Sequence, residues 1–309
     1  MKVSIIIPVY YNENNLKLLY DDIKQKYIDR IDYEYEIIFI DDYSKDNSFQ
    51  VLKELRLNDS HIKIYKLSKN FGAHSAILCG LSKCTGDFAI IKAADLQEPT
   101  EILFDMIDKW KDGYKVVLAV RHKRNDGKIN DIFSNLYYFI VRKFVLNNMP
   151  KGGFDVYLVD RKVINLLLQL DNSNTALTGQ ILWSGFNTGK VYYNRIERTI
   201  GKGRWTLRKK IKLVMDTVFS FTSLPIKMIE IVGFVSVLVS LLMAIYVFVN
   251  KITGKTTVDG FTALFIFQFF CFSVTILILG VIGEYLWRVF DSVKNKPQYI
   301  VEISDEEIH

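Results

Sequence analysis

The sequence predicts an α/β protein in which a mostly parallel sheet is flanked by helices and followed by two membrane-spanning helices. Through about residue 120, short β-branched runs alternate with longer helical patterns, which is typical of such a sheet. Two near-continuous apolar segments follow in the last third of the chain. Half of the 309 residues are apolar, so the chain can bury a sizeable core and extended disorder is excluded.

Five strands and four helices are expected in the first region. The strands are the β-branched runs Val3 to Val9, Glu36 to Ile40, Ile62 to Lys66, Phe88 to Lys92 and Lys115 to Ala119. The helices are the stretches at about Asn14 to Tyr27, Ser48 to Leu57, Ala73 to Cys84 and Pro99 to Trp110. Proline stands at the start of the last helix, where a missing backbone N–H is tolerated. The order predicts repeated strand–helix–strand units.

Between about residues 130 and 225, aromatic and basic side chains are interleaved in amphipathic stretches. The segment at about 131–147 is too short and too charged to span a bilayer, and its composition suits a helix in the headgroup region. The segment at about 207–222 is strongly basic and is expected at the same interface. Burial in the protein core is the alternative.

Two apolar segments, Ile229 to Val249 and Phe261 to Leu286, are each long enough to cross a hydrocarbon core of about 30 Å. The short link between them predicts a hairpin with both chain ends on one side. Basic residues near those ends outnumber those in the link, which places both ends in the cytoplasm, beneath a plasma (inner) membrane. The expected domains are a cytosolic region 1–225, two transmembrane helices in 226–287 and a cytosolic tail 288–309.

The formal net charge of +6 and the pI of about 8.9 suit nucleic acid, anionic lipid or a phosphate substrate without choosing among them. The run from Met1 to Val9 lacks a small-residue cleavage site, so a first strand is expected and not a signal peptide. Cys79, Cys84 and Cys271 have no paired metal-ligand spacing, so neither a zinc site nor a disulfide framework is expected.

Polar motifs follow the first three strands at the point where each strand ends. They are Pro8-Val9-Tyr10-Tyr11-Asn12-Glu13, Asp41-Asp42-Tyr43-Ser44-Lys45-Asp46 and Lys69-Asn70-Phe71-Gly72. Carboxylates at strand ends point into the crevice where open α/β sheets bind ligands, and there they accept hydrogen bonds from a ribose or a base. An isolated Asp-Asp pair would indicate only a turn, but the series predicts a nucleotide site.

Three further motifs extend this series. Ala94-Asp95-Leu96-Gln97-Glu98-Pro99 follows the fourth strand, Gly153-Phe154-Asp155 precedes a predicted helix, and Gly201-Lys202-Gly203-Arg204-Trp205 precedes the membrane segments. With them the chain resembles, over nearly its whole length, the family 2 glycosyltransferases of GT-A (Rossmann-like) fold. The resemblance is to the branch of dolichyl-phosphate mannose synthases and bacterial polyprenyl-phosphate glycosyltransferases. It implies a membrane-bound hexosyltransferase that inverts the anomeric carbon.

The resemblance also implies roles for individual residues. Asp155 and Asp95 are expected to be catalytic, and Asp95 is expected to bind Mg²⁺ or Mn²⁺. Lys202 and Arg204 are expected to hold the lipid phosphate or the leaving diphosphate, with attraction to anionic lipid as the alternative. Nucleotide-sugar binding is implied for Pro8, Tyr10, Glu13, Asp41, Asp42, Lys69, Asn70, Ala94, Asp95 and Gln97.

Two positions depart from the pattern of the branch, whose strand-four motif reads Asp-Ala-Asp-Leu-Gln-Asp-Pro. Ala93 replaces the first aspartate, so we expect weaker metal binding or help from Glu98. One aspartate can suffice, because a diphosphate and water fill the other positions around Mg²⁺. Tyr157 stands where relatives usually place arginine, so the contact that this arginine would make with a phosphate is not assigned to a residue here.

Asp155 matches the position that the family uses as catalytic base. A phosphate monoester is already largely dianionic near neutral pH, so Asp155 is expected to position the acceptor as much as to take a proton. The alternative is that Asp155 caps the helix expected at Arg161 to Leu170. His74 is expected at a helix start near the donor site and not as a ligand.

The expected reaction transfers a sugar to polyprenyl (undecaprenyl) phosphate for modification of a cell-envelope glycan. The donor is expected to be UDP-glucose or UDP-N-acetylglucosamine, with GDP-mannose left open. The expected partners are this nucleotide-sugar, the lipid, the bilayer and further copies of the chain in a homo-oligomer, but not nucleic acid. One alternative is a processive polysaccharide synthase, but such an enzyme needs more than two membrane helices to build a channel. The other is a catalytically inactive membrane scaffold, which the replacement of aspartate by Ala93 suggests.

Overall fold

The computed structural model describes residues 1–122, 141–143, 148–150, 153–170, 177–196, 222, 224–253, 260–294 and 296–308. The chain divides into two compact units. The first combines Met1–Thr217 with Lys296–His309, and the second is Val218–Asn295.

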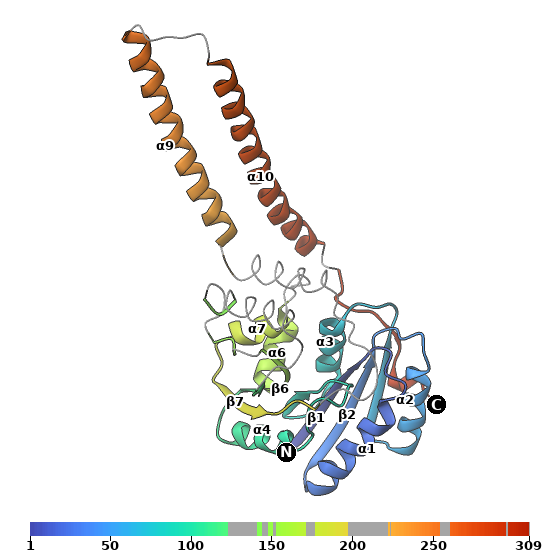
Figure 1. Ribbon diagram of the computed structural model, residues 1–309. Coiled ribbons are helices and arrows are strands. Elements are labelled where there is room, and N and C mark those ends of the chain that lie inside the picture. Colours follow the sequence, from blue (N-terminus) through green and yellow to red (C-terminus); the bar gives the residue numbers. More distant parts are fainter. Residues whose placement is uncertain are drawn as a thin grey trace. The chain divides into compact units, whose positions relative to one another are not determined.

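In the described part of the first unit, eight strands form one sheet (Figure 1). Across the sheet the order is β7-β5-β6-β4-β1-β2-β3-β8. Strand β1 pairs parallel with β2 and β4, β2 with β3, and β5 with β7, whereas β6 and β8 run antiparallel to their neighbours. The predicted mostly parallel sheet is therefore confirmed. The strands are β1 (Lys2–Val9), β2 (Glu34–Asp41), β3 (Ile62–Leu67), β4 (Phe88–Ile91), β5 (Val116–Arg121), β6 (Phe154–Asp160), β7 (Thr188–Tyr193) and β8 (Val301–Ile303).

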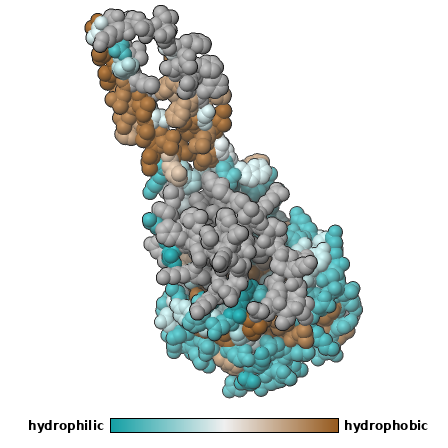
Figure 2. Space-filling model, viewed as in Figure 1, coloured by the Kyte–Doolittle hydropathy of each residue, from teal (hydrophilic) through white to brown (hydrophobic). Residues whose placement is uncertain are grey.

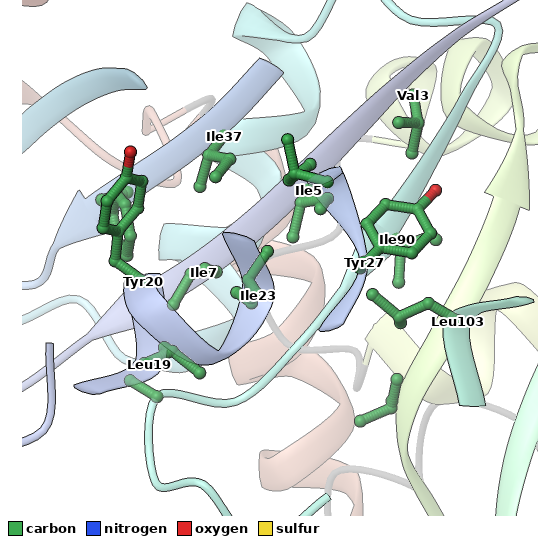
Figure 3. Packing of buried hydrophobic residues seen from close by; sticks show 14 of the residues in the cluster. Val3, Ile5, Ile7, Leu19, Tyr20, Ile23, Tyr27, Ile37, Ile90 and Leu103 are labelled. Atoms are coloured by element: carbon green, nitrogen blue, oxygen red, sulfur yellow. The ribbon is translucent and has the colours of Figure 1, made fainter. Parts of the chain in front are cut away.

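Helices cover both faces of this sheet, because successive residues of a buried strand point to opposite sides. Helices α1 (Leu16–Lys26), α2 (Ser48–Asn58) and α4 (Ile102–Lys111) pack on one face. Figure 3 shows Ile5 and Ile7 of β1 on this face with Leu19 and Ile23 of α1 and with Leu103 of α4. Burying each such side chain contributes about 1.5–3 kcal/mol.

The opposite face carries α3 (Ala73–Lys83), α6 (Arg161–Gln169) and α7 (Leu177–Trp183). Helix α3 lies very close to β1, since a Cβ atom on Gly80 would stand 2.4 Å from Cγ2 of Ile6. Only glycine permits this close approach of α3 to β1. The four helices expected in the first 120 residues are all present, although α4 begins three residues after Pro99.

Residues after the second unit return to the first unit and complete its sheet. Strand β8 pairs antiparallel with β3, and the short helix η2 (Asp305–Glu307) follows. Asp305 accepts hydrogen bonds from Arg56 Nε (3.0 Å) and from the backbone N–H of Ile64 (3.1 Å). The sequence predicts only a tail at 288–309, because a three-residue strand is too short for its alternation to be recognised.

The second unit contains α9 (Leu224–Ile252) and α10 (Phe261–Val293). The remaining short helix, the 3₁₀ helix η1 (Ile28–Arg30), follows α1 in the first unit. Large apolar side chains of both helices are exposed, as the brown surface in Figure 2 shows. Within the described residues, one segment is long and apolar enough to cross a membrane, Phe270–Val293, with 24 residues and a mean hydropathy of 1.9. The second predicted span therefore stays a prediction.

The two amphipathic interface helices fall mostly outside the described residues. Of the segment at 131–147, the structure describes residues 141–143, which are helical and in which Val141 is fully buried. Val141 therefore packs in the protein core, which is the alternative to a helix at the membrane interface. Of the segment at 207–222, only Thr222 is described.

Candidate active site

The carboxyl ends of β1 and β2 place two predicted motifs side by side. The strands are parallel and Val9 is in register with Asp41, so both chains leave the sheet at the same edge. The backbone N–H of Asp42 then donates to the carbonyl oxygen of Val9 at 2.9 Å. Pro8 and Tyr10 therefore lie next to the Asp41–Asp42 pair at the edge where α/β sheets bind ligands.

Three loops at this edge hold a non-glycine residue in the left-handed backbone region. The φ angles are 56° at Tyr11, 63° at Tyr43 and 58° at Leu96. Each such residue costs on the order of 1–3 kcal/mol and persists only when its surroundings enforce it. Part of that enforcement is visible, because the N–H of Tyr11 donates to Ser44 Oγ at 2.9 Å. The strain is concentrated where the ligand is expected.

Asp41 and Asp42 are both buried but have different partners. Asp41 accepts the N–H of Ser44, at 3.2 and 3.3 Å, and also interacts with the Ser44 side chain, but its burial outweighs both and raises the pKa of its carboxyl group. Asp42 accepts the N–H groups of Phe71 (2.7 Å) and Gly72 (2.9 Å), the residues that lead into α3. Asp42 thus fixes the third motif against the second.

The remaining nucleotide-site candidates surround this pair. Asn70 reaches the Asp42 carbonyl oxygen at 3.5 Å, and Lys69 Nζ lies 4.9 Å from the centre of the Phe71 ring. Glu13 instead accepts the N–H of Asn47, just before α2, so it orders a loop beside the site. His74 lies in the first turn of α3, and burial lowers the pKa of its ring. These contacts bring the first three motifs to one edge of the sheet.

The loop after β4 carries Asp95, and a hydrogen bond from Lys92 stabilises this loop. Lys92 is fully buried and donates from Nζ to the carbonyl oxygen of Glu98 at 2.7 Å. Glu98 is also buried, and its pKa is raised by burial and by the neighbouring charge of Asp95. Ala94 is buried beneath this loop, while Asp95 stays partly exposed and accepts the N–H of Gln97 at 3.4 Å.

Asp155 reaches the same edge because β6 runs antiparallel. Tyr157 of β6 is in register with Ile91 of β4, so the beginning of β6 lies beside the ends of β4 and β5. There Asp155 forms an ion pair with Arg121, the last residue of β5. Asp155 is 48% exposed whereas Arg121 is 8% exposed, so a buried cation holds an accessible carboxylate.

The other end of β6 excludes the capping role considered for Asp155. Asp160 is the residue that caps α6, accepting the N–H of Lys162 at 3.0 Å. It also accepts Trp110 Nε1 (2.8 Å) and Lys115 Nζ (2.9 Å). The carboxylate with a capping function therefore lies at the opposite edge of the sheet from Asp155.

Comparison with known proteins explains this geometry. Residues 4–167, more than half of the chain, match the family described as glycosyl transferase family 2. The chain is a family 2 glycosyltransferase. The GT-A resemblance noted from the motifs is thereby confirmed, and an α/β fold of this kind is what the sheet and its two helical layers form.

Relatives of this glycosyltransferase match along nearly their full length. YkcC of Bacillus subtilis, named an uncharacterised glycosyltransferase, is 34% identical over 98% of this chain and 94% of its own. The SfII prophage-derived bactoprenol glucosyl transferase of Shigella flexneri is 29% identical, with 98% of each chain covered. A mannosyltransferase structure from Pyrobaculum calidifontis, in complex with GDP-Man and Mn²⁺, has a TM-score of 0.46 at 15% identity and covers 65% of this chain and 58% of its own.

The carboxylates of the glycosyltransferase fit a divalent metal held largely by its substrate. Among the described residues there is no group of three or more His, Cys, Asp or Glu side chains arranged to hold a metal. Asp95 is nevertheless partly exposed, and Oε2 of the nearby Glu98 is buried without a hydrogen-bond partner in the described part of the chain. One or two protein carboxylates with a diphosphate and water are a normal Mg²⁺ environment.

Cations near the loop after β4 come from positions that the sequence does not single out. Arg121 ends β5, and Arg195, just after β7, donates to Oε1 of Gln97. Tyr157 is buried in the core, its hydroxyl has no hydrogen-bond partner among the described residues, and its pKa is raised by burial, so it does not replace the expected arginine. The position of Arg121 at a strand end is the one signal that could have indicated it. The predicted phosphate ligands Lys202 and Arg204 lie outside the described residues.

Proposed function

We propose that this glycosyltransferase moves a sugar from a nucleotide-diphospho-sugar to polyprenyl (undecaprenyl) phosphate. The convergence of Asp41, Asp42, Asp95 and Asp155 on one sheet edge is the observation that carries the proposal. Full-length similarity to bactoprenol glucosyl transferases supports the lipid acceptor. UDP-glucose or UDP-N-acetylglucosamine is the proposed donor, and the lipid-linked sugar would serve modification of a cell-envelope glycan.

The proposed reaction is a single displacement. An oxygen of the lipid phosphate attacks the anomeric carbon, the bond from that carbon to the diphosphate breaks, and the nucleoside diphosphate leaves with inversion of configuration. Asp155, held by Arg121, orients the acceptor next to the reacting carbon. Mg²⁺ or Mn²⁺ bound with the donor at Asp95 would supply positive charge to the leaving diphosphate. Lys202 and Arg204 are proposed to hold the lipid phosphate.

A second membrane span is supported by the path of the chain. Residues on both sides of the second unit, up to Thr217 and from Lys296, fold into the same first unit. Both ends of the second unit must therefore lie on one side of any membrane that it crosses, so the number of crossings is even. If Phe270–Val293 crosses, another segment crosses as well, and the 29-residue α9 is the one we propose.

The test incubates membranes that contain the protein with radiolabelled UDP-glucose, UDP-N-acetylglucosamine and GDP-mannose, each with Mg²⁺. We expect label from one donor to extract into organic solvent, and mild acid to release it, as a sugar phosphodiester of a lipid would. An identical preparation carrying Asp155→Asn is the control and should lose this label. Label that stays as polymer would indicate a polysaccharide synthase, and no incorporation from any donor would contradict the proposal.

A further inference from the structure

Two side chains engage the guanidinium of Arg121. Its Nη2 forms the ion pair with Asp155, and its Nε donates to the hydroxyl of Tyr193 at 3.3 Å. These two nitrogens share one edge of a planar, rigid group, so the two contacts together determine how the guanidinium is turned. The contact with Asp155 is therefore made by a guanidinium whose orientation Tyr193 helps to fix.

Strand pairing brings Tyr193 to this position. Strands β5 and β7 are parallel, and Arg121 and Tyr193, the last residues of the two strands, are in register. Beyond the strands, the N–H of His122 donates to the carbonyl oxygen of Tyr193 at 2.9 Å. Tyr193 is 3% exposed, so close packing fixes its ring in the core. Its hydroxyl is thus an acceptor at a fixed place beside Arg121.

Glu98 is an alternative partner for the same guanidinium. It is 2% exposed, and Arg121 lies close enough to interact with its charge. Among the described residues its Oε2 has no hydrogen-bond partner, so a guanidinium that turned toward Glu98 would satisfy a buried acceptor. The Tyr193 hydroxyl already occupies the Nε–H of Arg121. Loss of this hydroxyl would free the Nε–H for Glu98 and weaken the hold on Asp155.

Asp155 needs a fixed partner because it is open to solvent. It is 48% exposed, and an exposed side chain keeps several rotamers unless a contact selects one. Arg121 is 8% exposed and provides that contact. The orientation of Asp155 thus depends on Arg121, and the orientation of Arg121 depends on Tyr193.

Resting on the proposed function, we propose that Tyr193 is a positioning residue that keeps the guanidinium of Arg121 on Asp155 and so keeps Asp155 aimed at the acceptor. Tyr193 is buried and acts through Arg121. Removing its hydroxyl should therefore slow sugar transfer without weakening donor binding. One hydrogen bond to a charged group corresponds to about tenfold in rate.

The experiment compares Tyr193→Phe with the wild type, using the full chain in detergent. Farnesyl phosphate is the acceptor, and the donor is the nucleotide-sugar that labels lipid in the membrane test. We expect kcat to fall about tenfold, while KM for the nucleotide-sugar stays within about twofold. Phenylalanine keeps the buried ring, and thermal unfolding should show that the variant is folded.

Tyr20→Phe is the matched control. Tyr20 is also a buried tyrosine, and its hydroxyl donates to Asp59 Oδ2 at 2.9 Å, away from Arg121. The variant loses one hydrogen bond, as Tyr193→Phe does, but it should keep the wild-type kcat. A similar fall in kcat for both variants would mean that loss of a buried hydroxyl is enough to slow the enzyme, and would overturn the role of Tyr193.

A second background tests whether Tyr193 acts through Arg121. Arg121→Met removes every donor at this position, so adding Tyr193→Phe should change kcat by less than about twofold. The same tenfold loss in both backgrounds, or a wild-type kcat in Tyr193→Phe, overturns the inference and leaves lipid-directed transfer intact. If Arg121→Met is inactive, the kcat and KM of Tyr193→Phe decide. Absence of labelled lipid from the wild type would instead contradict the proposed function, and this inference with it.

Discussion

The two ends of β2 bury one carboxylate each and stabilise it in opposite ways. At the amino end, Glu36 is 2% exposed and accepts hydrogen bonds from Ser4 Oγ (2.6 Å), Lys63 Nζ (2.8 Å) and the N–H of Thr85 (2.6 Å). Burial alone would raise the pKa of Glu36, but these bonds outweigh burial and lower the pKa to about 2. The charge at this end helps to hold the sheet together.

At the carboxyl end, Asp41 is fully buried but receives far less compensation. The N–H of Ser44 reaches it at 3.2 and 3.3 Å, the Ser44 side chain and the charge of Lys66 add to this, and burial still prevails, so the pKa of Asp41 is raised. The same contrast separates Asp160, whose pKa is lowered by three hydrogen bonds that outweigh burial, from Glu98, whose pKa is raised. Carboxylates with full sets of partners contribute to stability, and those without are available for a ligand.

Asp95→Asn should produce the largest effect. It removes a partly exposed carboxylate from the ligand edge, so sugar transfer should fall by at least about a hundredfold while the melting temperature hardly changes. Transfer to lipid and thermal unfolding are measured on the same preparation. Asp108→Asn, on an exposed face of α4, should leave both unchanged. Wild-type turnover by Asp95→Asn at saturating Mg²⁺ would remove Asp95 from the mechanism.

Glu36→Gln should do the reverse. Removing one partner from a buried ionic cluster leaves the lysine side chains without their carboxylate and costs about 3 kcal/mol of unfolding free energy. For a unit of this size the melting temperature should fall by roughly 6–12 °C. Turnover per folded molecule should be unchanged. A melting temperature within about 2 °C of wild type would show that the cluster at the amino end is not stabilising.

Acid should destabilise the protein through the same residue. The folded pKa of Glu36, about 2, lies below its ordinary value of 4.5, so its contribution is complete above pH 4.5 and is lost as the pH falls toward 2. Between pH 6 and pH 3 this loss amounts to about 2 kcal/mol. Urea unfolding at both pH values measures it. In Glu36→Gln the decrease should be smaller by that amount, and equal decreases in the two proteins would contradict the assignment.

Asp41→Asn should shift stability in the opposite direction from Glu36→Gln. Asparagine can still accept the Ser44 N–H but carries no buried charge, so the free energy of unfolding should rise by about 1 kcal/mol at neutral pH. Nucleotide binding should weaken, because a ribose or base loses a charged acceptor. Thermal unfolding and calorimetry with UDP test the two effects. A lower melting temperature would mean that Asp41 is as well compensated as Glu36.

Ala93→Asp should have the smallest effect, on the metal requirement. A second carboxylate near Asp95 adds an oxygen ligand, so the Mg²⁺ concentration for half-maximal transfer should fall several-fold, by up to about tenfold. A Mg²⁺ titration of lipid transfer measures this, with Ala93→Asn as an uncharged control. An unchanged or higher requirement would show that position 93 does not face the metal.

Much of the fold could be predicted because the first 120 residues have a simple periodicity. The expected strands at Val3 to Val9 and Ile62 to Lys66 differ from β1 and β3 by one residue at one end. Strand β6 was not predicted, since Asp155 interrupts its apolar run, and β8 has only three residues. When a strand forms because it pairs with a strand far away in the sequence, its own residues show little of the alternation from which strands are predicted.

The sequence predicts those site residues whose positions follow from the parallel strands alone. Parallel strands end at one edge, which is why Asp41 and Asp42 could be placed beside Pro8. The ion pair between Asp155 and Arg121 could not, because it depends on β6 running antiparallel. Arg195 was missed for a related reason, since its partner Gln97 lies in another strand–helix unit.

The pairing of β8 with β3 has a consequence for how the protein is made. Residues 296–308 leave the ribosome only after α9 and α10 have been synthesised, yet they supply the neighbour of β3 and the partner of Arg56. Until then the edge of β3 presents unpaired N–H and C=O groups, which other strands can recruit. Folding of the catalytic unit is therefore finished only after the two apolar helices have been synthesised, so this unit is completed at the very end of its biosynthesis.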